Sequence, residues 1–409
     1  MRDPRVPQTG EHRVLVTNAQ LRSGLAAIRS LGEKGISVTA ADSDRICSGF
    51  FSRYAVRKLL HPDPQANADG FVEAVLRELN SQPYDLIMPI NDHTMVPLSK
   101  HKKEIEQLTR YPYLPYEQLV VAHDKALTVQ AALECGVRVP RTSVVSSEDD
   151  IRKAMVEHDF PVILRPRRSS GSRGLILVES KGQLLRDYPK VLTQYGSAIV
   201  QEYIPWGGMT YDVCVLMSPT SQPRAVFVGN RLRTYPVAAG PNVLGQGVEY
   251  PELRDLGLRM LAHLKWQGPA QVEFRIDPRD EAPVLMEVNP RFWGSMFLGI
   301  ISGVDFPYLF YRMAVEGDIE PVLSYRTDMK ARWLWPGDIL NLLFNPHRLQ
   351  VLPSWLGGFF DPRTKMYVPS LRDPLPVLGT LLATSVYGLS PRRLRYVLRL
   401  GGGANRGRP

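Results

Sequence analysis

Two acidic residues stand opposite each other on a predicted β-hairpin that runs from Gln271 to Arg291. Both halves are rich in β-forming residues, and the Pro-Arg-Asp-Glu run between them is typical of a turn. In a hairpin centred on Asp280, Glu273 faces Glu287 across the ladder, and directly opposed side chains lie about 5 Å apart. One face of the hairpin therefore carries two carboxylates.

The same register places Gln271 opposite Asn289. The other face is apolar and carries Val272, Phe274, Val284, Met286 and Val288. Opposed carboxylates repel by up to about 1 kcal/mol on a solvated sheet, and a divalent cation removes this repulsion. Mg²⁺ suits the place because it takes hard oxygen ligands, often one or two carboxylates, and Mn²⁺ is a substitute. The hairpin alone is equally compatible with a solvated face whose acids pair with Arg275 or Arg291.

A second candidate site is a glycine- and serine-rich loop between two predicted strands. The strand at 161–166 leads into Arg-Arg-Ser-Ser-Gly-Ser-Arg-Gly at 167–174, and a strand at 175–178 follows. The tip of such a hairpin can fold over phosphates, which backbone N–H groups and guanidinium forks then contact. We favour this role over an ordinary hairpin because Arg165 lies at the mouth of the strand, where an isolated cation is costly.

Two further arginines follow a predicted strand in the second half of the chain. The segment 231–236 is expected to leave the sheet and to enter a glycine-rich loop that reaches Gly247. Arg231 and Arg233 are two residues apart, so on a strand they project to the same face. We favour joint binding of a carboxylate or phosphate over simple solvation.

The N-terminal part predicts an open parallel sheet. Strands at 13–17 and 36–41 flank a helix at 23–32, and a helix at about 66–79 precedes a strand at 84–90. Asn91 or Asp92 can cap the next helix. The first turn lacks the dinucleotide-binding glycine pattern, so its loops either bind a substrate or serve as a scaffold.

The middle of the chain predicts a helix and then antiparallel strands. Asp124 opens the helix with Lys125 at its first position, and Gly136 ends it. Strands are expected at 197–204, 211–217 and 224–229, with a turn at 205–208.

Composition indicates a globular protein without a secretory signal or a membrane-spanning segment. The 409 residues are 44% hydrophobic and 22% charged, and we expect two or three domains. Cys47, Cys135 and Cys214 are few and far apart, which argues against a disulfide framework or a cysteine zinc site. We therefore expect a cytoplasmic protein, and we expect no nucleic-acid partner.

The basic excess lies entirely in residues 321–409. Lys and Arg exceed Asp and Glu by 13 to 4 there, which equals the net charge of +9 of the whole chain. The apolar run at 374–389 contains two prolines and is too short to span a bilayer. The basic run at 391–400 is a candidate for peripheral association with an anionic membrane surface or an acidic partner. A packed extension with solvated arginines is the alternative.

These features in this order resemble the ATP-grasp superfamily, and more narrowly the carbamoyl-phosphate-synthase-like carboxylate–amine ligases. The resemblance covers residues 13–320 and is most specific at Met-Glu-Val-Asn-Pro-Arg-Phe-Trp-Gly-Ser, 286–295, followed by Gly-Val-Asp-Phe-Pro at 303–307. The resemblance implies an α/β chain, with α+β character in its ATP-binding part. The implied divisions are a disordered N-terminus at 1–12, a parallel-sheet domain at 13–115, an ATP-grasp domain at 116–320 with lobes at about 140–203 and 204–320, and a basic extension at 321–409.

The resemblance also implies roles for individual residues. Glu273, Glu287 and Asn289 would hold Mg²⁺, and Arg291 would stabilise the transferring phosphoryl group or acyl phosphate, with Arg231 and Arg233 beside it. The expected ATP-binding residues are Lys125, Arg165, Ser170, Gly171, Ser172, Gly174, Gln201, Glu202, Tyr203, Ile204 and Asp212. The family's acidic ribose contact is missing after the hinge at 201–204, where Asp212 is a weak substitute, and this puts nucleotide affinity in doubt.

The implied activity is ATP-dependent phosphorylation of a carboxylate to an acyl phosphate, followed by attack of an amine and release of ADP and phosphate. The partners would be small-molecule carboxylates and amines, and a second copy in a homodimer. The alternatives are a carboxylase or carbamate-phosphorylating enzyme, and a nucleotide-binding regulatory protein without turnover.

Overall fold

The computed structural model describes residues 12–168, 174–237 and 240–388. Some expectations lie outside the described residues. They are residues 1–11 of the expected disordered N-terminus, the loop residues Ser170, Gly171 and Ser172, and the basic run at 391–400.

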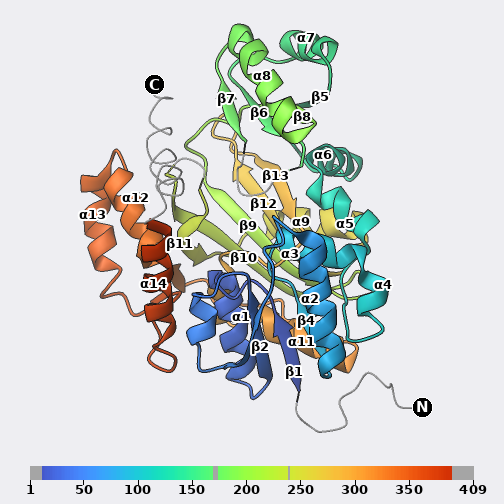
Figure 1. The fold of residues 1–409 in the computed structure, drawn as a ribbon. Coiled ribbons are helices and arrows are strands. Elements are labelled where there is room, and N and C mark those ends of the chain that lie inside the picture. Colours follow the sequence, from blue (N-terminus) through green and yellow to red (C-terminus); the bar gives the residue numbers. More distant parts are fainter. Residues whose placement is uncertain (1–11, 169–173, 238–239, 389–409) are drawn as a thin grey trace.

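The N-terminal domain is built on the predicted open parallel sheet (Figure 1). Its strand order is β3-β2-β1-β4, and all three pairings are parallel. The elements are β1 (Arg13–Val16), α1 (Arg22–Gly32), β2 (Ser37–Asp42), a 3-10 turn η1 (Ser48–Phe51), β3 (Ala55–Leu60), α2 (Ala68–Ser81), β4 (Leu86–Met88), α3 (Asp92–Lys100) and α4 (Lys102–Ile105). Strand β3 was not predicted; it lies at the sheet edge, where Val56 and Leu60 stay exposed, so it lacks an apolar pattern.

Two helices lead from this domain into a small lobe with its own apolar core. They are α5 (Tyr116–His123) and α6 (Lys125–Glu134). The small lobe contains β5 (Thr142–Val145), α7 (Glu148–Glu157), β6 (Val162–Pro166), β7 (Ile176–Val178), α8 (Lys181–Tyr195) and β8 (Ala198–Glu202). Its antiparallel sheet has the order β5-β8-β6-β7, and β6 and β7 form the predicted hairpin around the glycine- and serine-rich loop.

A seven-stranded sheet forms the large lobe, in the order β13-β12-β9-β10-β11-β14-β15. Its first part contains β9 (Thr210–Met217), β10 (Pro223–Thr234), β11 (Asn242–Gly247), α9 (Pro251–His263), β12 (Gly268–Ile276), β13 (Pro283–Asn289), α10 (Met296–Ile301) and α11 (Phe306–Glu316). The expected loop up to Gly247 is wrong, because β10 continues to Thr234 and β11 returns antiparallel to it. The structure explains the glycine at position 247, because a Cβ there would lie 2.8 Å from the carbonyl oxygen of Arg326.

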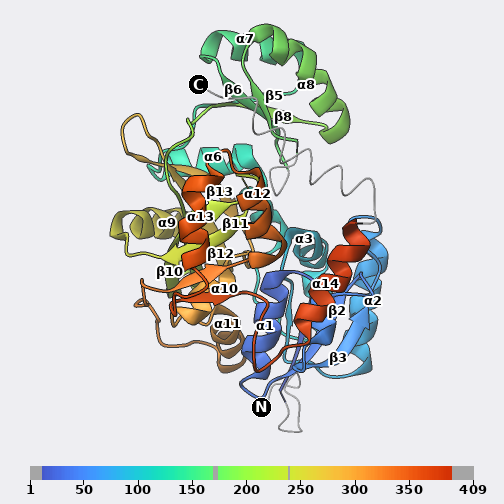
Figure 2. The ribbon, with the colours of Figure 1, turned by 90° about the vertical axis from the view of Figure 1, so that its left-hand side faces the viewer.

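The C-terminal extension completes this sheet. Strand β14 (Lys330–Arg332) pairs with β11, and β15 (Thr364–Met366) pairs with β14. A short turn (Leu334–Asp338) precedes α12 (Ile339–Phe344), α13 (Arg348–Gly357) and α14 (Pro376–Gly388). The three helices lie along one side of the molecule, at the left of Figure 1 and facing the viewer in Figure 2. None of the helices in the described residues is long and apolar enough to span a membrane.

Candidate active site

Three acidic residues form a row across the large-lobe sheet. The pairing of β12 with β13 is the predicted one, with Glu273 opposite Glu287 and Gln271 opposite Asn289. Strand β9 lies on the other side of β12 and places Asp212 opposite Glu273. Asp212, Glu273 and Glu287 therefore occupy neighbouring positions on three adjacent strands.

A β-bulge directly follows this row and corrects one predicted position. The pairing shifts between Glu273 and Phe274, so that Leu285 opposes Phe274 and is buried. Met286 is the extra residue of the bulge and is only half-buried. Leu285 therefore takes the position on the apolar face of the hairpin that was expected for Met286.

Arg231 joins two members of the acidic row. Its Nη2 lies 2.6 Å from Oδ1 of Asp212, its Nε lies 3.2 Å from Oδ2 of the same residue, and Nη2 also donates to Glu273. Burial raises the pKa of Glu273, and the nearby charges of Glu287 and Asp212 add to this against the effect of Arg231. Asp212 is thus engaged by Arg231 on the sheet, and its expected role as a ribose contact stays a prediction.

Glu287 faces the small lobe and meets its cations. Nη2 of Arg165, on β6, lies 3.5 Å from Oε2 of Glu287, and Nδ2 of Asn289 donates to Oε1 at 3.1 Å. Burial alone would raise the pKa of Glu287, but the charges of Arg165 and Lys125 outweigh burial and lower it. Arg165 and Glu287 therefore form one of the contacts between the two lobes.

Lys125 is the first residue of α6, as predicted, and its N-cap Asp124 is fully buried. Arg167 and Arg168 both donate to Asp124, at 2.6 Å and 3.0 Å. Burial, followed by repulsion from Arg165, lowers the pKa of Lys125 to about 8. Lys125 and Arg165 form a compact cationic pair opposite Glu287.

Arg291 ties the hairpin to the N-terminal domain. Its Nε donates to Asp92 at 2.8 Å, its Nη1 to the carbonyl of Phe292 at 2.9 Å, and its Nη2 to Oδ1 of Asn289 at 3.0 Å. Asp92 is buried at the start of α3, whose cap is Asn91. Sequence reasoning considered Asp92 only as a helix cap, although an acid directly after a strand end was the available signal.

Arg22 is a site residue that sequence reasoning missed. It is the first residue of α1 and donates from Nη1 to the carbonyl of Asn242 at 2.6 Å. Its guanidinium lies 4.5 Å from the ring of Trp333 and 4.9 Å from that of Tyr367. Within the described residues Arg22 forms no ion pair, although the charge of Asp212 acts on it. An added Cβ on Gly294 would lie 3.0 Å from its Nη2. The signal was an arginine at the carboxyl end of the first strand.

Arg233 does not lie with Arg231. The pairing of β10 with β11 shifts by one residue between them, which breaks the alternation on which their common face depended. Arg233 donates to both oxygens of the fully buried Asp338, at 2.7 Å and 2.8 Å, and Arg332 donates to Asp338 at 2.6 Å. The expected joint binding of one anion by Arg231 and Arg233 is therefore corrected.

The segment between the lobes, 201–204, is fixed by side-chain contacts. Nε2 of Gln201 donates to Oγ1 of Thr142 at 3.0 Å, Ile204 is buried, and the hydroxyl of Tyr203 accepts from the backbone of Trp206 at 3.2 Å. In the glycine- and serine-rich loop, Gly174 has a φ of +72°, and a Cβ there would lie 2.7 Å from Pro166.

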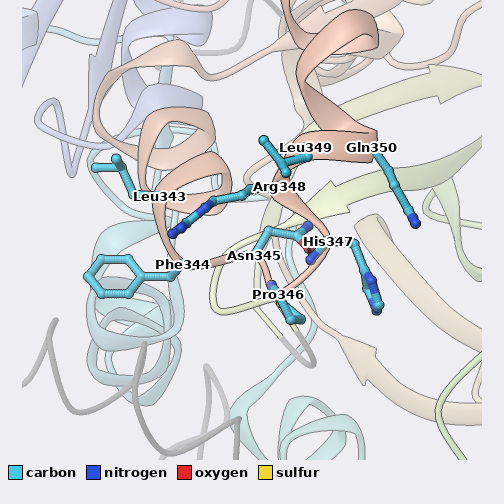
Figure 3. A pocket seen from close by; sticks show the side chains of 8 residues that line it. All are labelled: Leu343, Phe344, Asn345, Pro346, His347, Arg348, Leu349 and Gln350. Atoms are coloured by element: carbon cyan, nitrogen blue, oxygen red, sulfur yellow. Dashed lines mark hydrogen bonds between the residues drawn. The ribbon is translucent and has the colours of Figure 1, made fainter.

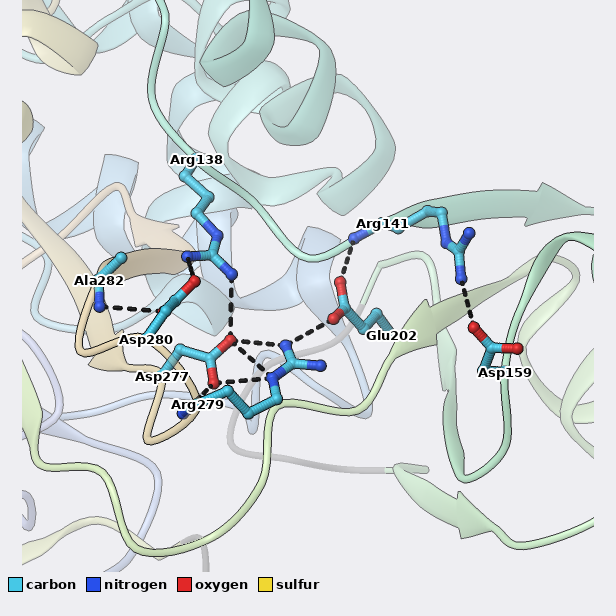
Figure 4. Close-up of polar contacts among 8 residues, drawn as sticks. All are labelled: Arg138, Arg141, Asp159, Glu202, Asp277, Arg279, Asp280 and Ala282. Carbon is cyan, nitrogen blue, oxygen red and sulfur yellow. Dashed lines mark hydrogen bonds and ion pairs between the residues drawn. The ribbon is translucent and has the colours of Figure 1, made fainter.

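Glu202 is the centre of a polar network that joins the lobes (Figure 4). It accepts from Arg279 at 2.6 Å and from the backbone of Arg141 at 3.2 Å. Arg279 also donates to Asp277, and Arg138 donates to the same carboxylate at 3.1 Å. The turn of the β12–β13 hairpin is thereby fastened to the end of β8.

The donor set fits one Mg²⁺ ion rather than a site built on many acids. No group of three or more His, Cys, Asp or Glu side chains arranged to hold a metal occurs within the described residues. Glu273 and Glu287 oppose each other, and Oδ1 of Asn289 accepts only from Arg291 in this structure, which leaves one of its two lone pairs. Two carboxylates and an amide oxygen match the partial protein coordination that Mg²⁺ accepts.

Two lobes that meet at Arg165 and Glu287, behind a parallel-sheet domain, form the arrangement expected from the resemblance to ATP-grasp proteins. Residues 239–335 match a family model described as "ATP-grasp in the biosynthetic pathway with Ter operon". Carbamoyl phosphate synthase large chain from Thermoanaerobacter pseudethanolicus is 21% identical over 286 residues, which are 66% of this chain and 26% of that protein. The chain thus spans about a quarter of the length of this relative.

Solved structures agree on the fold. One is the biotin carboxylase domain dimer of 2-oxoglutarate carboxylase from Hydrogenobacter thermophilus, in complex with MgADP, ADP and bicarbonate. Its TM-score to this chain is 0.64 at 16% sequence identity, and the match covers 78% of this chain and 73% of that one. Another is L-amino acid ligase from Bacillus licheniformis, with a TM-score of 0.59, 17% identity, and coverage of 77% and 78%. The matched family model agrees with the resemblance to ATP-grasp proteins drawn from the sequence, and the solved structures share the fold of this chain.

Proposed function

We propose that this protein is an ATP-dependent ligase that phosphorylates a small-molecule carboxylate to an acyl phosphate and couples it to an amine. ADP and phosphate are released. The observation that carries the proposal is the meeting of Lys125 and Arg165 from one side with Glu287 and the acidic row from the other. Cations that face acids across a lobe boundary suit a phosphate chain held between them with a divalent metal.

In this proposal each site residue has a separate role. Lys125 and Arg165 hold the ATP phosphates, and the segment 201–204 lies against the adenine. Glu287, Glu273 and Asn289 hold Mg²⁺, with Mn²⁺ as a substitute; the bound ion neutralises charge on the phosphate oxygens. Arg291, fixed by Asp92, lies where the N-terminal domain meets the hairpin and stabilises the acyl phosphate.

Arg231 and Arg22 have different tasks. Arg231 neutralises Asp212 and Glu273, so it keeps the acidic row stable when no metal is bound. Arg22 has aromatic neighbours and forms no ion pair within the described residues, which suits recognition of the substrate carboxylate. Arg233 is occupied by Asp338 and takes no part in the chemistry.

A second candidate is phosphorylation of bicarbonate or carbamate. The sequence similarity to carbamoyl phosphate synthase and the structural similarity to a biotin carboxylase domain favour it. The structural similarity to an L-amino acid ligase favours the carboxylate–amine reaction. The substrates distinguish the two reactions.

The test is release of ADP from Mg-ATP with pooled carboxylic acids, with hydroxylamine as the amine. We expect acid-dependent ADP release and a hydroxamate product, both lost in Glu287→Gln. Glu320→Gln removes an exposed acid far from the row in sequence and should behave as the unchanged protein. ADP release that requires bicarbonate and no other acid supports the second candidate. Release that persists in Glu287→Gln contradicts the metal and phosphate roles assigned here.

A further inference from the structure

Arg22 lies where the strand order of the N-terminal sheet reverses. The chain passes from β1 to β2 on one side of β1, and from β3 to β4 on its other side. Arg22 begins α1 after β1, and Asp92, the partner of Arg291, begins α3 after β4. Ligands of open parallel sheets usually bind outside the carboxyl ends of two such neighbouring strands. Arg22 and Arg291 therefore both border the place where a ligand is expected.

Arg22 and Arg291 face opposite ends of the acidic row. The charge of Asp212 acts on Arg22, and the charge of Glu287 acts on Arg291. Asp212 lies on β9 and Glu287 on β13, with β12 between them, so the row spans about 10 Å. Two guanidinium groups at the two ends of the row can hold two separate anionic groups of one substrate.

The guanidinium of Arg22 has one edge without a protein acceptor. Its Nη1 donates to the carbonyl of Asn242, but within the described residues its Nε and Nη2 donate to none. Both nitrogens lie beside Gly294, where an added Cβ would be 3.0 Å from Nη2 and 3.3 Å from Nε. Both oxygens of Asp212 accept from Arg231 instead. Two neighbouring N–H donors of one guanidinium can bind a carboxylate through two parallel hydrogen bonds.

The aromatic residues that hold Arg22 belong to the C-terminal extension. Trp333 follows β14 and Tyr367 follows β15, and their rings lie 4.5 Å and 4.9 Å from the guanidinium. The backbone N–H of Trp333 donates to the carbonyl of Val243 at 2.7 Å, and that of Tyr367 donates to the carbonyl of Arg332 at 3.1 Å. Because these contacts fix both rings at strand ends, the rings orient the guanidinium before a substrate binds.

The hydroxyl of Tyr367 is a further donor at this place. Tyr367 is 4% exposed, and within the part of the chain that the structure describes its hydroxyl has no hydrogen-bond partner. Burial raises the pKa of this phenol to about 12, so the hydroxyl keeps its proton at neutral pH. A buried donor without an acceptor is costly, and an oxygen of a bound substrate removes that cost.

The hollow between α12 and α13 is a separate feature of the extension. Its volume is about 520 Å³, and its lining residues all lie at 343–350 (Figure 3). Neither Trp333 nor Tyr367 is among them. The extension therefore reaches the candidate active site through the ends of its two strands, whereas α12 and α13 lie along one side of the molecule (Figure 2).

We propose that the acid substrate is a dicarboxylate and that the C-terminal extension completes its binding site. One carboxylate attacks the γ-phosphorus of ATP beside Arg291 and ADP leaves; the amine then forms the C–N bond, phosphate leaves, and the amine's proton passes to solvent. The second carboxylate keeps its bonds and accepts hydrogen bonds from Nε and Nη2 of Arg22 and from the hydroxyl of Tyr367. This inference rests on the proposed function, because it concerns the acid that the reaction consumes.

The experiment measures ADP release from Mg-ATP with straight-chain dicarboxylic acids of increasing length and with the monomethyl ester of each, with hydroxylamine as the amine. The ester keeps one carboxylate for phosphorylation and lacks the second charge. We expect kcat/KM for the best dicarboxylic acid to exceed that for its ester by about tenfold or more. Arg22→Gln should remove this preference and Tyr367→Phe should reduce it about fivefold, while kcat/KM for the ester stays unchanged.

Tyr188→Phe is the matched control for Tyr367→Phe. Tyr188 is also 4% exposed, and its hydroxyl also lacks a partner among the described residues, but it lies on α8 of the small lobe. This variant should keep the full preference. Calorimetric titration of the best dicarboxylic acid into the unchanged protein and into Arg22→Gln measures binding without turnover.

The outcomes separate this inference from the ligase function. Equal kcat/KM for the dicarboxylic acids and their esters, or a preference that survives in Arg22→Gln, overturns the inference and leaves the ligase function standing. Binding that is lost in Arg22→Gln, without ADP release, supports the site and contradicts the ligase function. Neither binding nor ADP release with any acid contradicts both. If the esters equal the dicarboxylic acids once an amino acid replaces hydroxylamine, Arg22 binds the amine and the inference is wrong.

Discussion

If Lys125 holds the ATP phosphates as we propose, its protonation controls how strongly the free site attracts a phosphate chain. Its pKa is lowered to about 8, first by burial and then by Arg165. The ammonium is lost as pH rises through that value, so the affinity for ATP should fall by up to about tenfold per unit between about pH 8 and about pH 10. Isothermal titration calorimetry at several pH values measures this. Lys125→Arg keeps its charge over this range and should lose the dependence; an unchanged pH profile in that variant contradicts the role.

The partners of the individual acidic residues could be predicted only where both partners lie close together in the sequence. Glu273 and Glu287 are joined by a short turn, so the alternation of apolar residues fixes their register. Arg231 reaches Asp212 and Glu273 from a different strand, and nothing local indicates that contact. A single bulge then separated Arg231 from Arg233, because one extra residue reverses the alternation.

At the scale of elements, the turn of the β12–β13 hairpin is the part that fastens the two lobes. Arg279 and Glu202 are 47% and 29% exposed, so their ion pair contributes no more than about 1 kcal/mol to stability. In the proposed function, its greater effect is on the position of 201–204, the segment that we assign to the adenine. Arg279 also pairs with the buried Asp277, which keeps Arg138 as a partner, so we expect Arg279→Gln to lower the melting temperature. We also expect it to raise KM for ATP by up to about tenfold, with a smaller change in kcat.

A matched variant tests this assignment. Arg312 pairs with Glu316 on the surface of α11, and the two side chains are 39% and 46% exposed. Arg312→Gln removes a comparable ion pair away from the lobe boundary and should leave KM unchanged. Equal KM values for the two variants would mean that the network at Glu202 does not position the nucleotide.

Elements with local signals were predicted well. Helix α6 begins after Asp124 and α3 after Asn91 because each cap accepts a backbone N–H of its own first turn. Strand β11 reads Asn-Val-Leu-Gly-Gln-Gly, and its glycines are typical of a loop. It forms a strand because β10 and β14 pair with it from both sides, which is information that only the whole chain contains.

At the scale of the molecule, Asp373 holds the two ends of the described chain together. It is 1% exposed and accepts from Nε of Arg29 at 2.9 Å, Oγ of Ser52 at 2.8 Å and the backbone of Arg53 at 2.9 Å. Removal of one partner from a buried ion pair costs about 3–5 kcal/mol. We expect Asp373→Asn to lower the free energy of unfolding in urea by about 3 kcal/mol.

Asp361→Asn is the control for the contacts of Asp373 with Arg29, Ser52 and Arg53. Asp361 pairs with Lys330, but both side chains are partly exposed, so the loss should stay below about 1 kcal/mol. A similar loss for both variants would mean that Asp373 does not fasten the N-terminal domain.

The contact between Arg29 and Asp373 also determines when folding can be completed during synthesis of the chain. Arg29 and Asp373 are 344 residues apart. At about 5–20 residues per second, a ribosome needs roughly 17–69 s to travel from one to the other. Through that interval the N-terminal sheet lacks its contact with Asp373. Final assembly therefore follows the emergence of the last part of the chain, and a nascent chain halted before Asp373 should be the form that chaperones and proteases recognise.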